Sequence, residues 1–337
     1  MPKSLKPFAR KMARLFHNIF LLQYHFFGFF YTVCIILFTR HRDIYSKLGF
    51  LEQKYRIGYY EIKMPRFSKF IEYMEDQTLR ELGLGILAYE FSKKYDRSKK
   101  VIDIGANIGV TAAIMSSFSK GSIRLHLIEP SPYYFHFLSN NAGLIPGVEK
   151  IDNSFIAWSK DSNEIKGALF HEKSSAYFVP DDNAPTLFAQ PLSLLAGADT
   201  KLIKIDTDGF DFKIIKANLD YFSEQKPILF FESEFLAPQN HVEYIETFKG
   251  LFNAGYSYYI FWSARGNFVM EMNDLEGIKK LHNLLFRQEK LILTDSYDIA
   301  ALHQEDKDVY DKVLNYFSNA KHLNREAFLA EISKTNP

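Results

Sequence analysis

The stretch Val101-Ile102-Asp103-Ile104-Gly105-Ala106-Asn107-Ile108-Gly109 joins a short apolar segment to a turn that contains two glycines. It predicts a strand over 101–104 and a helix over 110–118, because glycine permits the tight turn between them. Turns of this kind face the crevice at the carboxyl end of a parallel strand, where such sheets bind nucleosides. A dinucleotide fingerprint would also have glycine at position 107. Asn107 instead favours a ligand with an amino-acid end, and we predict that Asp103, Gly105, Asn107 and Gly109 bind a cofactor.

Outward from this turn, short apolar strands alternate with helical stretches, which is typical of a parallel sheet covered on both faces. We therefore predict an α/β fold with a doubly wound, mostly parallel sheet. A hairpin-like insert is expected up to about residue 179, and the segment 267–272 is expected to pair with the strand before it. The other predicted strands cover residues 123–128, 151–158, 202–206, 227–231, 256–262 and 298–302.

Carboxylates follow two of the predicted strands. Glu129 comes about twenty residues after the glycine turn, where an acidic side chain can accept hydrogen bonds from ribose hydroxyls. Asp206 and Asp208 stand at the carboxyl end of the fourth strand, which lies beside the first in a doubly wound sheet. They could act as a general base on a substrate hydroxyl or hold a divalent cation, and the sequence leaves both open.

The same segment also allows a purely structural interpretation. Asp208 and Asp211 resemble an N-cap arrangement for the helix that follows, so Asp208 serves either that helix or the chemistry. Asp211 is more readily explained as structural, and Asp206 as functional. Glu232, at the end of the fifth strand, is a weaker candidate near the substrate.

These motifs, from Val101 to about Phe235, resemble those of the FkbM family of methyltransferases. Asp103 to Gly109 match its opening turn, and Lys204-Ile205-Asp206-Thr207-Asp208-Gly209-Phe210-Asp211 match its most specific motif, with aspartate at 208 and 211 where glutamate is usual. Further matches are Glu129-Pro130-Ser131-Pro132, Pro227 to Glu232 and Asp298-Ile299-Ala300-Ala301. The resemblance implies a class I methyltransferase (Rossmann-like) sheet, S-adenosylmethionine as donor and a hydroxyl acceptor. In that family the acceptor is often a sugar of a glycan or glycosylated metabolite. The alternatives are a NAD-dependent oxidoreductase and a non-catalytic membrane adaptor.

The charge and cysteine content of the chain bear on nucleic-acid binding, on disulfide formation and on structural zinc. The formal net charge of the chain is +1, which argues against a basic face that binds nucleic acid. Cys34 is the single cysteine, so no disulfide forms within the chain and a reducing compartment is expected. No paired Cys/His spacing suggests structural zinc.

The N-terminal segment combines basic residues with an uncharged run. Five Lys and Arg residues lie between Lys3 and Arg14, and no charged residue occurs from Leu15 to Thr39. The run is long enough to span a bilayer, to lie in its interface or to pack against a partner chain. A cleaved signal peptide is less consistent, because no small-residue cleavage site follows. If the run spanned the bilayer, the positive-inside rule would place the N-terminus in the cytoplasm. The catalytic domain would then lie on the other side of the membrane, away from the cytosolic methyl donor. We therefore favour an interfacial anchor on the cytoplasmic face of a membrane, with a soluble cytoplasmic protein as the alternative.

These observations predict four parts. A membrane-associating helix covers residues 1–42, a helical linker 43–100, the methyltransferase domain 101–305 and a C-terminal helix 306–337. The basic residues Lys93, Lys94, Arg97, Lys99 and Lys100 are interpreted as a solvated helix end and linker.

Overall fold

The computed structural model describes residues 52–66, 68, 70–76, 79–160, 162–172, 175–234, 238–287, 296–319 and 324–334. The region from Gln53 to Pro337 is one compact unit. The predicted membrane-associating helix over 1–42 lies outside the described residues. Within them, no helix combines the length and the apolar character that crossing a bilayer requires.

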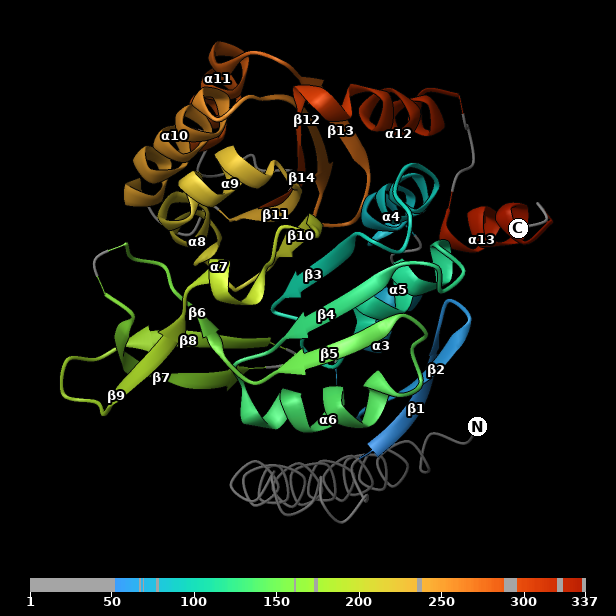
Figure 1. The fold of residues 1–337 in the computed structure, drawn as a ribbon, viewed down its shortest axis with the longest axis horizontal. Coiled ribbons are helices and arrows are strands. Elements are labelled where there is room, and N and C mark those ends of the chain that lie inside the picture. The colour runs from blue at the N-terminus through green and yellow to red at the C-terminus, as the bar shows by residue number, and fades with distance from the viewer. Residues whose placement is uncertain are drawn as a thin grey trace, which may run out of the picture. The chain divides into compact units, whose positions relative to one another are not determined.

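An eight-stranded sheet forms the centre of this unit, in the order β13-β12-β14-β11-β10-β3-β4-β5 (Figure 1). Its parallel part contains β3 (Lys100–Ile104), β4 (Arg124–Ile128), β5 (Val148–Asp152), β10 (Thr200–Ile205) and β11 (Ile228–Glu234). The antiparallel side is formed by β14 (Ser296–His303), β12 (Tyr256–Ser263) and β13 (Phe268–Met272). β10 pairs with β3, as predicted. The predicted α/β fold with a doubly wound, mostly parallel sheet is therefore confirmed.

Alternate residues of the strands face opposite layers of helices. Val101 and Leu202 belong to one buried cluster, whereas Ile102 and Ile203 belong to the other, as the two-residue period of a strand requires. The first layer contains α4 (Leu82–Lys94), α5 (Val110–Phe118), α6 (Pro132–Ala142), α12 (Lys307–Asn319) and α13 (Arg325–Lys334). The second contains α7 (Leu192–Leu195), α8 (Asp211–Ala217), α9 (Leu219–Gln225), α10 (Pro238–Asn253) and α11 (Leu275–Arg287). Both faces of the sheet are covered, so its strands can be apolar throughout.

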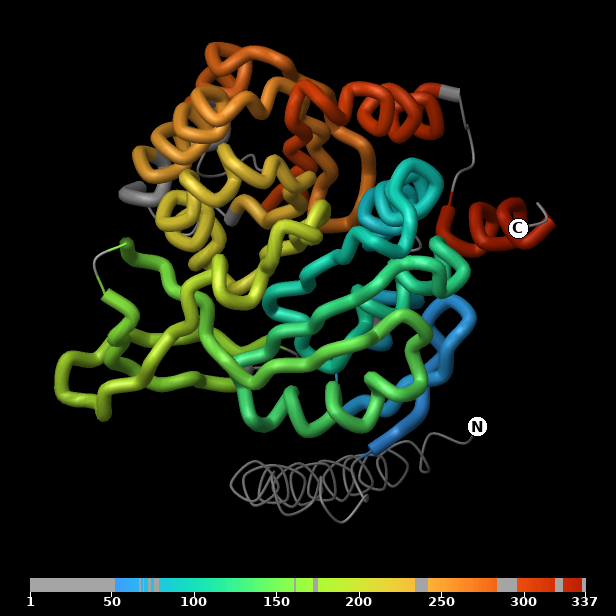
Figure 2. Tube along the Cα trace, in the orientation of Figure 1, coloured from blue at the N-terminus to red at the C-terminus, as the bar shows by residue number. Residues whose placement is uncertain are grey.

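A second, four-stranded sheet is inserted between β5 and β10. It has the order β6-β9-β7-β8 and contains β6 (Phe155–Ile156), β7 (Glu164–Glu172), β8 (Ser175–Pro180) and β9 (Thr186–Gln190). The arrowheads of β3, β4 and β5 point toward this small sheet, and the tube trace shows it beside that edge (Figure 2). The prediction of one strand over 151–158 is wrong. Asn153 donates through Nδ2 to the carbonyl oxygens of Glu129 and Pro130, and the strand ends there.

The prediction that residues 43–100 are helical is wrong for their first described part. β1 (Glu52–Ile57) and β2 (Tyr60–Pro65) form a hairpin, and only α3 (Phe70–Asp76) and α4 follow as helices. Ile62 and Met64 are both buried, which is the two-residue period of a strand. The predicted single C-terminal helix is likewise two: after the 3-10 turn η1 (Gln304–Asp306), α12 ends at Asn319 and α13 begins at Arg325.

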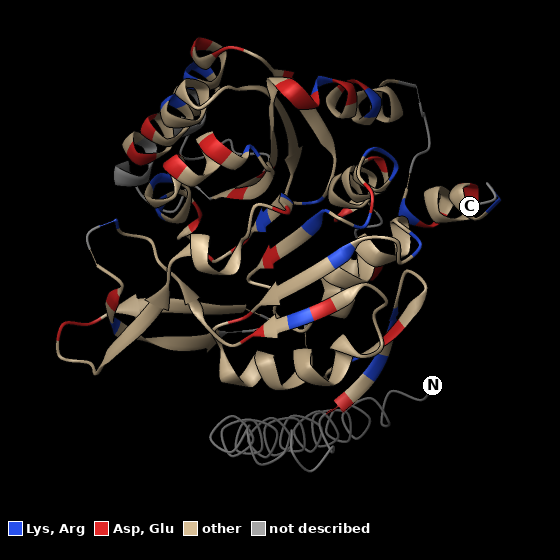
Figure 3. Ribbon diagram, viewed as in Figure 1, with Lys and Arg blue, Asp and Glu red and all other residues tan. Residues whose placement is uncertain are grey.

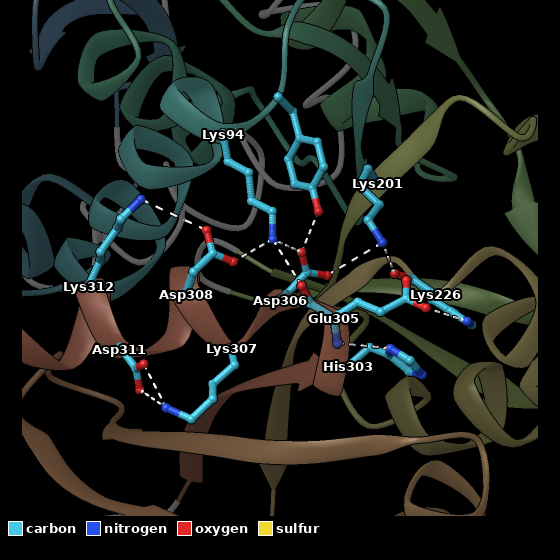
Figure 4. Close-up of polar contacts among 11 residues, drawn as sticks. Lys94, Lys201, Lys226, His303, Glu305, Asp306, Lys307, Asp308, Asp311 and Lys312 are labelled. Atoms are coloured by element: carbon cyan, nitrogen blue, oxygen red, sulfur yellow. Dashed lines mark hydrogen bonds and ion pairs between the residues drawn. The ribbon is translucent and has the colours of Figure 1, made fainter.

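Lys94 belongs to a buried polar network instead of a solvated helix end, so the interpretation of the basic run is wrong for this residue. Asp306 is fully buried, and it pairs with Lys94 at 2.8 Å and with Lys201 at 3.4 Å (Figure 4). The hydroxyl of Tyr95 also donates to Asp306. The network joins α4, β10 and η1. Elsewhere, acidic and basic residues are mixed along α10, α11 and α12, whereas the small sheet carries few charges (Figure 3).

Candidate active site

A cavity of about 250 Å³ opens at the carboxyl edge of β4, β3 and β10. Ile104 at the end of β3 is in register with Ile128 of β4 and with Ile205 of β10, so the loops that follow these strands meet at one edge. Five of the predicted site residues line the cavity: Gly105, Asn107, Glu129, Asp206 and Asp208. The loops that follow β3, β4 and β10 therefore bring these five residues together.

Gly105 lets the glycine turn approach the end of β10 closely. Its φ is +78°, and a Cβ built there would lie 1.8 Å from the backbone oxygen of Asp206. Asn107 also has a positive φ, of 51°. Gly109 does not line the cavity. A Cβ at Gly109 would contact Leu138 and Ile145 at 3.2–3.3 Å, so the structure places this glycine in the packing of α5 against α6.

Asp103 lies beneath the cavity and is not part of its lining. It is fully buried, its Oδ2 accepts a hydrogen bond from the hydroxyl of Thr111 at 2.5 Å, and its Oδ1 lies 3.1 Å from Nζ of Lys204. Lys204 is also buried; its Nζ donates to the carbonyl oxygen of Gly105 at 3.2 Å and lies 3.1 Å from Oδ2 of Asp206. Lys204 therefore links the glycine turn to the candidate catalytic carboxylate, a role that no pattern in the sequence indicates.

Glu129 closes the other side of the glycine turn. It is buried, its Oε2 accepts a hydrogen bond from the backbone N–H of Asn107 and its Oε1 accepts one from that of Ser131, both at 2.8 Å. Each carboxylate oxygen has a second acceptor position, so the side chain can still accept from a ligand hydroxyl. Burial raises the pKa of Glu129 to about 7 in spite of these two hydrogen bonds.

Asp211 has the structural role that the sequence favoured. Its Oδ1 accepts hydrogen bonds from the backbone and hydroxyl of Thr207, and its Oδ2 accepts one from the backbone N–H of Glu232. Burial and the charge of Asp206 raise the pKa of Asp211 to about 7. The N-cap of α8 is Phe210, with no capping side chain, so Asp208 does not occupy the predicted cap position. Asp208 has a φ of +49°, a conformation that aspartate tolerates better than most residues.

Four more charged residues line the cavity beyond Asp206. Glu232 lies near the end of β11, Asp298 lies opposite it on β14, and Arg80 and Glu81 come from the turn before α4. Asp298 belongs to a motif that the sequence shares with the FkbM family, whereas no sequence pattern indicated that Arg80 or Glu81 would line the site. Burial raises the pKa of Glu81 and, strongly, that of Asp298.

Aromatic side chains form the wall on the side of the small sheet. Phe155, Trp158, Phe178 and Phe210 line the cavity, and the rings of Trp158 and Phe210 lie 4.7 Å apart between centroids. The described residues contain no group of three or more His, Cys, Asp or Glu side chains arranged to hold a metal ion.

The comparisons with known proteins identify the domain that carries this site. Residues 103–258 match the model of the methyltransferase FkbM domain. No curated protein matches the chain. Among solved structures, the chain is similar to the FkbM methyltransferase of Methylobacillus flagellatus KT, with 21% identity, a TM-score of 0.31, and coverage of 41% of this chain and 33% of that one.

Two further solved structures are similar. TYW2 of M. jannaschii, in complex with AdoMet, has 13% identity, a TM-score of 0.36 and coverage of 74% of this chain and 85% of that one. A SAM-dependent O-methyltransferase of Thermotoga maritima has 12% identity, a TM-score of 0.33 and coverage of 62% and 61%. The motif resemblance and the family match agree: residues 103–258 form a methyltransferase domain of the FkbM family, with S-adenosylmethionine as its methyl donor.

Proposed function

We propose that this protein transfers a methyl group from S-adenosylmethionine to a hydroxyl, and that the hydroxyl belongs to a sugar in a glycan or glycosylated metabolite. The observation that carries the proposal is the position of Asp206. Its side chain is 42% exposed in the cavity, and its Oδ2 is held by Lys204 at 3.1 Å. In the described part of the chain, Oδ1 has no hydrogen-bond or ion-pair partner, so it is free to receive a proton.

The residues at the glycine turn are compatible with S-adenosylmethionine. Glu129 retains acceptor positions for ribose hydroxyls, and Gly105 brings the turn against the end of β10. Ser154 supplies an independent observation: its Oγ is buried, and it has no hydrogen-bond partner among the described residues although the residue lines the cavity. A polar ligand atom would satisfy it.

S-adenosylmethionine supplies an electrophilic methyl group when it is bound. The contribution of the chain is to position a hydroxyl near Asp206 and to accept the proton that this hydroxyl loses as its oxygen gains the methyl group. A positioned base of this kind typically accelerates a reaction by about 10²–10⁴-fold. Lys204 fixes one oxygen of Asp206 and thereby orients the other. Asp208 lines the same cavity, and we propose that it contacts the acceptor.

The test is Asp206→Asn. We expect turnover to fall by about 10²–10⁴-fold, while the affinity for S-adenosylhomocysteine, measured by titration calorimetry, changes by no more than a few-fold. Asp220→Asn is the matched control, because the Asp220 side chain is 83% exposed and should not affect turnover. Full turnover of Asp206→Asn would remove Asp206 from the role of base. An absence of methyl transfer by the wild-type protein to every saccharide tried would favour the non-catalytic adaptor.

A thermal shift experiment separates this proposal from the oxidoreductase alternative. A ligand that binds only the folded state raises the melting temperature. We expect S-adenosylhomocysteine to stabilise the protein and NAD to have no effect. Stabilisation by NAD alone would reverse the order of the two functions.

We also propose that residues 1–42 place the enzyme on the cytoplasmic face of a membrane. The support is the uncharged run from Leu15 to Thr39 between basic residues. Deletion of residues 1–42 should move the protein from the membrane pellet to the soluble fraction. Continued pelleting of the shortened chain would refute this anchor.

A further inference from the structure

The cavity extends past Asp206 into a region that the matched domain does not cover. Residues 103–258 supply the glycine turn, Glu129 and Asp206, whereas Arg80, Glu81 and Asp298 lie outside that range. If Asp206 receives the proton of the acceptor, the acceptor must occupy the space next to it. The residues of this distal part therefore contact the acceptor and determine which molecules fit.

Glu81 is a largely buried carboxylate that makes few contacts with described residues. Its side chain is 12% exposed, and its one ion-pair contact within the described part of the chain is with Nε of Arg80 at 3.7 Å, which is longer than a hydrogen bond. Among the described residues, no donor forms a hydrogen bond with it. Buried carboxylates normally have donors, so this one is suited to a donor on a ligand.

Asp298, on β14, is a second carboxyl group that lacks a hydrogen-bond donor among the described residues. It is half-buried, it lines the cavity, and no described residue donates a hydrogen bond to it. It is also in register with Glu232 on the antiparallel neighbour β11, and Glu232 faces the same cavity. Two carboxylates directly opposite each other destabilise a sheet when both are charged, which favours the uncharged form of Asp298. An arrangement that costs stability and leaves an acceptor unused is typical of a functional site.

The turn that carries Arg80 and Glu81 is held from two sides. Nη1 of Arg80 donates to the carbonyl oxygen of Ala264, and Gly266 in the same hairpin packs so closely that a Cβ there would lie 1.9 Å from the oxygen of Leu79. From α13, Arg325 donates to the carbonyl oxygen of Arg80 at 2.8 Å. Glu81 therefore has a fixed position relative to Asp206.

We propose that Glu81 and Asp298 bind the acceptor by accepting hydrogen bonds from hydroxyls next to the reacting one, and that they select an uncharged sugar over an acidic one. This inference rests on the proposed function. Glu81, Asp206, Asp208, Glu232 and Asp298 all line the distal region, with Arg80 and Lys204 as its cations. A carboxylate or phosphate on the acceptor would be repelled by the carboxylate of Asp206 and would supply no hydrogen-bond donor to Glu81 or Asp298, whereas hydroxyls supply the donors that these two side chains lack.

The experiment uses the full chain, labelled S-adenosylmethionine and three pairs of sugars: the methyl glycosides of glucose, galactose and mannose, each with its uronic acid. The neutral member of at least one pair should be methylated, with a kcat/KM roughly tenfold or more above that of its acid. Glu81→Gln and Asp298→Asn should each lower kcat/KM for the neutral sugar by roughly tenfold to a hundredfold, mainly through KM, and should reduce the discrimination. Their affinity for S-adenosylhomocysteine should stay within about threefold of wild type.

Thermal unfolding gives a readout that needs no acceptor. Because each variant replaces a carboxyl group that accepts no hydrogen bond from a described residue, we expect the melting temperature of both to stay the same or rise by about 1–2 °C. Glu276→Gln, whose side chain is 70% exposed on α11, is the matched control and should change neither activity nor stability.

The outcomes separate this inference from the proposed function. Equal or better methylation of the uronic acids would overturn the selection of uncharged sugars and leave the proposed function standing. Methylation of no sugar by a protein that binds S-adenosylhomocysteine would overturn the proposed function and the inference with it. A fall of several degrees in the melting temperature of Glu81→Gln and Asp298→Asn would show that the two carboxylates are structural, whatever the acceptor.

Discussion

Replacing Gly105 by alanine tests the geometry on which the active site depends. The new Cβ would lie 1.8 Å from the backbone oxygen of Asp206, where contacts under 3.0 Å essentially never occur. The turn or the end of β10 must therefore move by about 1 Å. In addition, an alanine at a φ of +78° is in the left-handed region, which costs about 1–2 kcal/mol. Overpacking of a well-packed region adds about 1–3 kcal/mol. We expect Gly105→Ala to lower the free energy of unfolding by about 2–5 kcal/mol.

We expect a larger effect on turnover than on stability, because the backbone oxygen that must move belongs to Asp206, the candidate base. A misplacement of about 1 Å can reduce turnover by roughly a hundredfold. The glycine turn also contributes Asn107, whose N–H is bonded to Glu129, so the affinity for S-adenosylhomocysteine should fall as well. Urea unfolding and titration calorimetry measure the two effects separately.

Gly143→Ala is the matched control for this substitution. Gly143 has a φ of −70° at the end of α6, and a Cβ there would have no atom within 4 Å. Alanine should therefore leave ligand affinity unchanged and raise the free energy of unfolding by about 0.4–1 kcal/mol, because it restricts the unfolded chain. If Gly105→Ala unfolds at the same urea concentration as Gly143→Ala and binds S-adenosylhomocysteine equally well, the close approach of the turn to Asp206 is refuted.

Three other substitutions test charges at and away from the cavity. Asp306→Ala removes the common partner of Lys94 and Lys201, and urea unfolding should show a loss of about 3–5 kcal/mol; a loss below about 1 kcal/mol would show that these lysines find water instead. Lys204→Met leaves the fully buried Asp103 without its cation, so we expect a similar loss of stability and slower turnover, and normal turnover would contradict the linking role of Lys204. Because burial raises the pKa of Glu129 to about 7, protonation below that pH weakens it as an acceptor. Calorimetry should therefore show S-adenosylhomocysteine binding more weakly as the pH falls, by up to about tenfold per pH unit below 7, and Glu129→Gln should lack this dependence.

The sequence predicted the parts of the site that follow directly from strand and turn patterns. The glycine turn, Glu129 and Asp206 each come immediately after an apolar strand, and parallel strands bring their carboxyl ends to one edge. Strand and turn patterns did not predict which side chains of the turn line the cavity. Asp103 was expected to contact the ligand, yet it is buried, does not line the cavity and pairs with Lys204, because it still belongs to β3 and precedes the turn. Gly109 was expected there too and packs against α6 instead.

The distal residues were missed for a different reason. The position of Glu81 depends on contacts of its turn with the hairpin at 264–266 and with Arg325, which lie more than 180 residues away in the chain. No local pattern reports such contacts. The prediction of a helical linker over residues 43–100 overlooks the hairpin β1–β2, although the alternation at Ile62 and Met64 is that of a strand.

Part of the acceptor side of the cavity lies outside the matched residues. The FkbM domain match ends at residue 258, and all residues that we assign to the cofactor lie within it. Arg80, Glu81 and Asp298 lie on elements before and after the match and complete the distal side. A change of acceptor can therefore occur by substitution in the flanking turn and in β14, without disturbing the turn that holds the methyl donor. Lys204 and Asp206 are the points of contact between the two halves, so a substitution there must affect both.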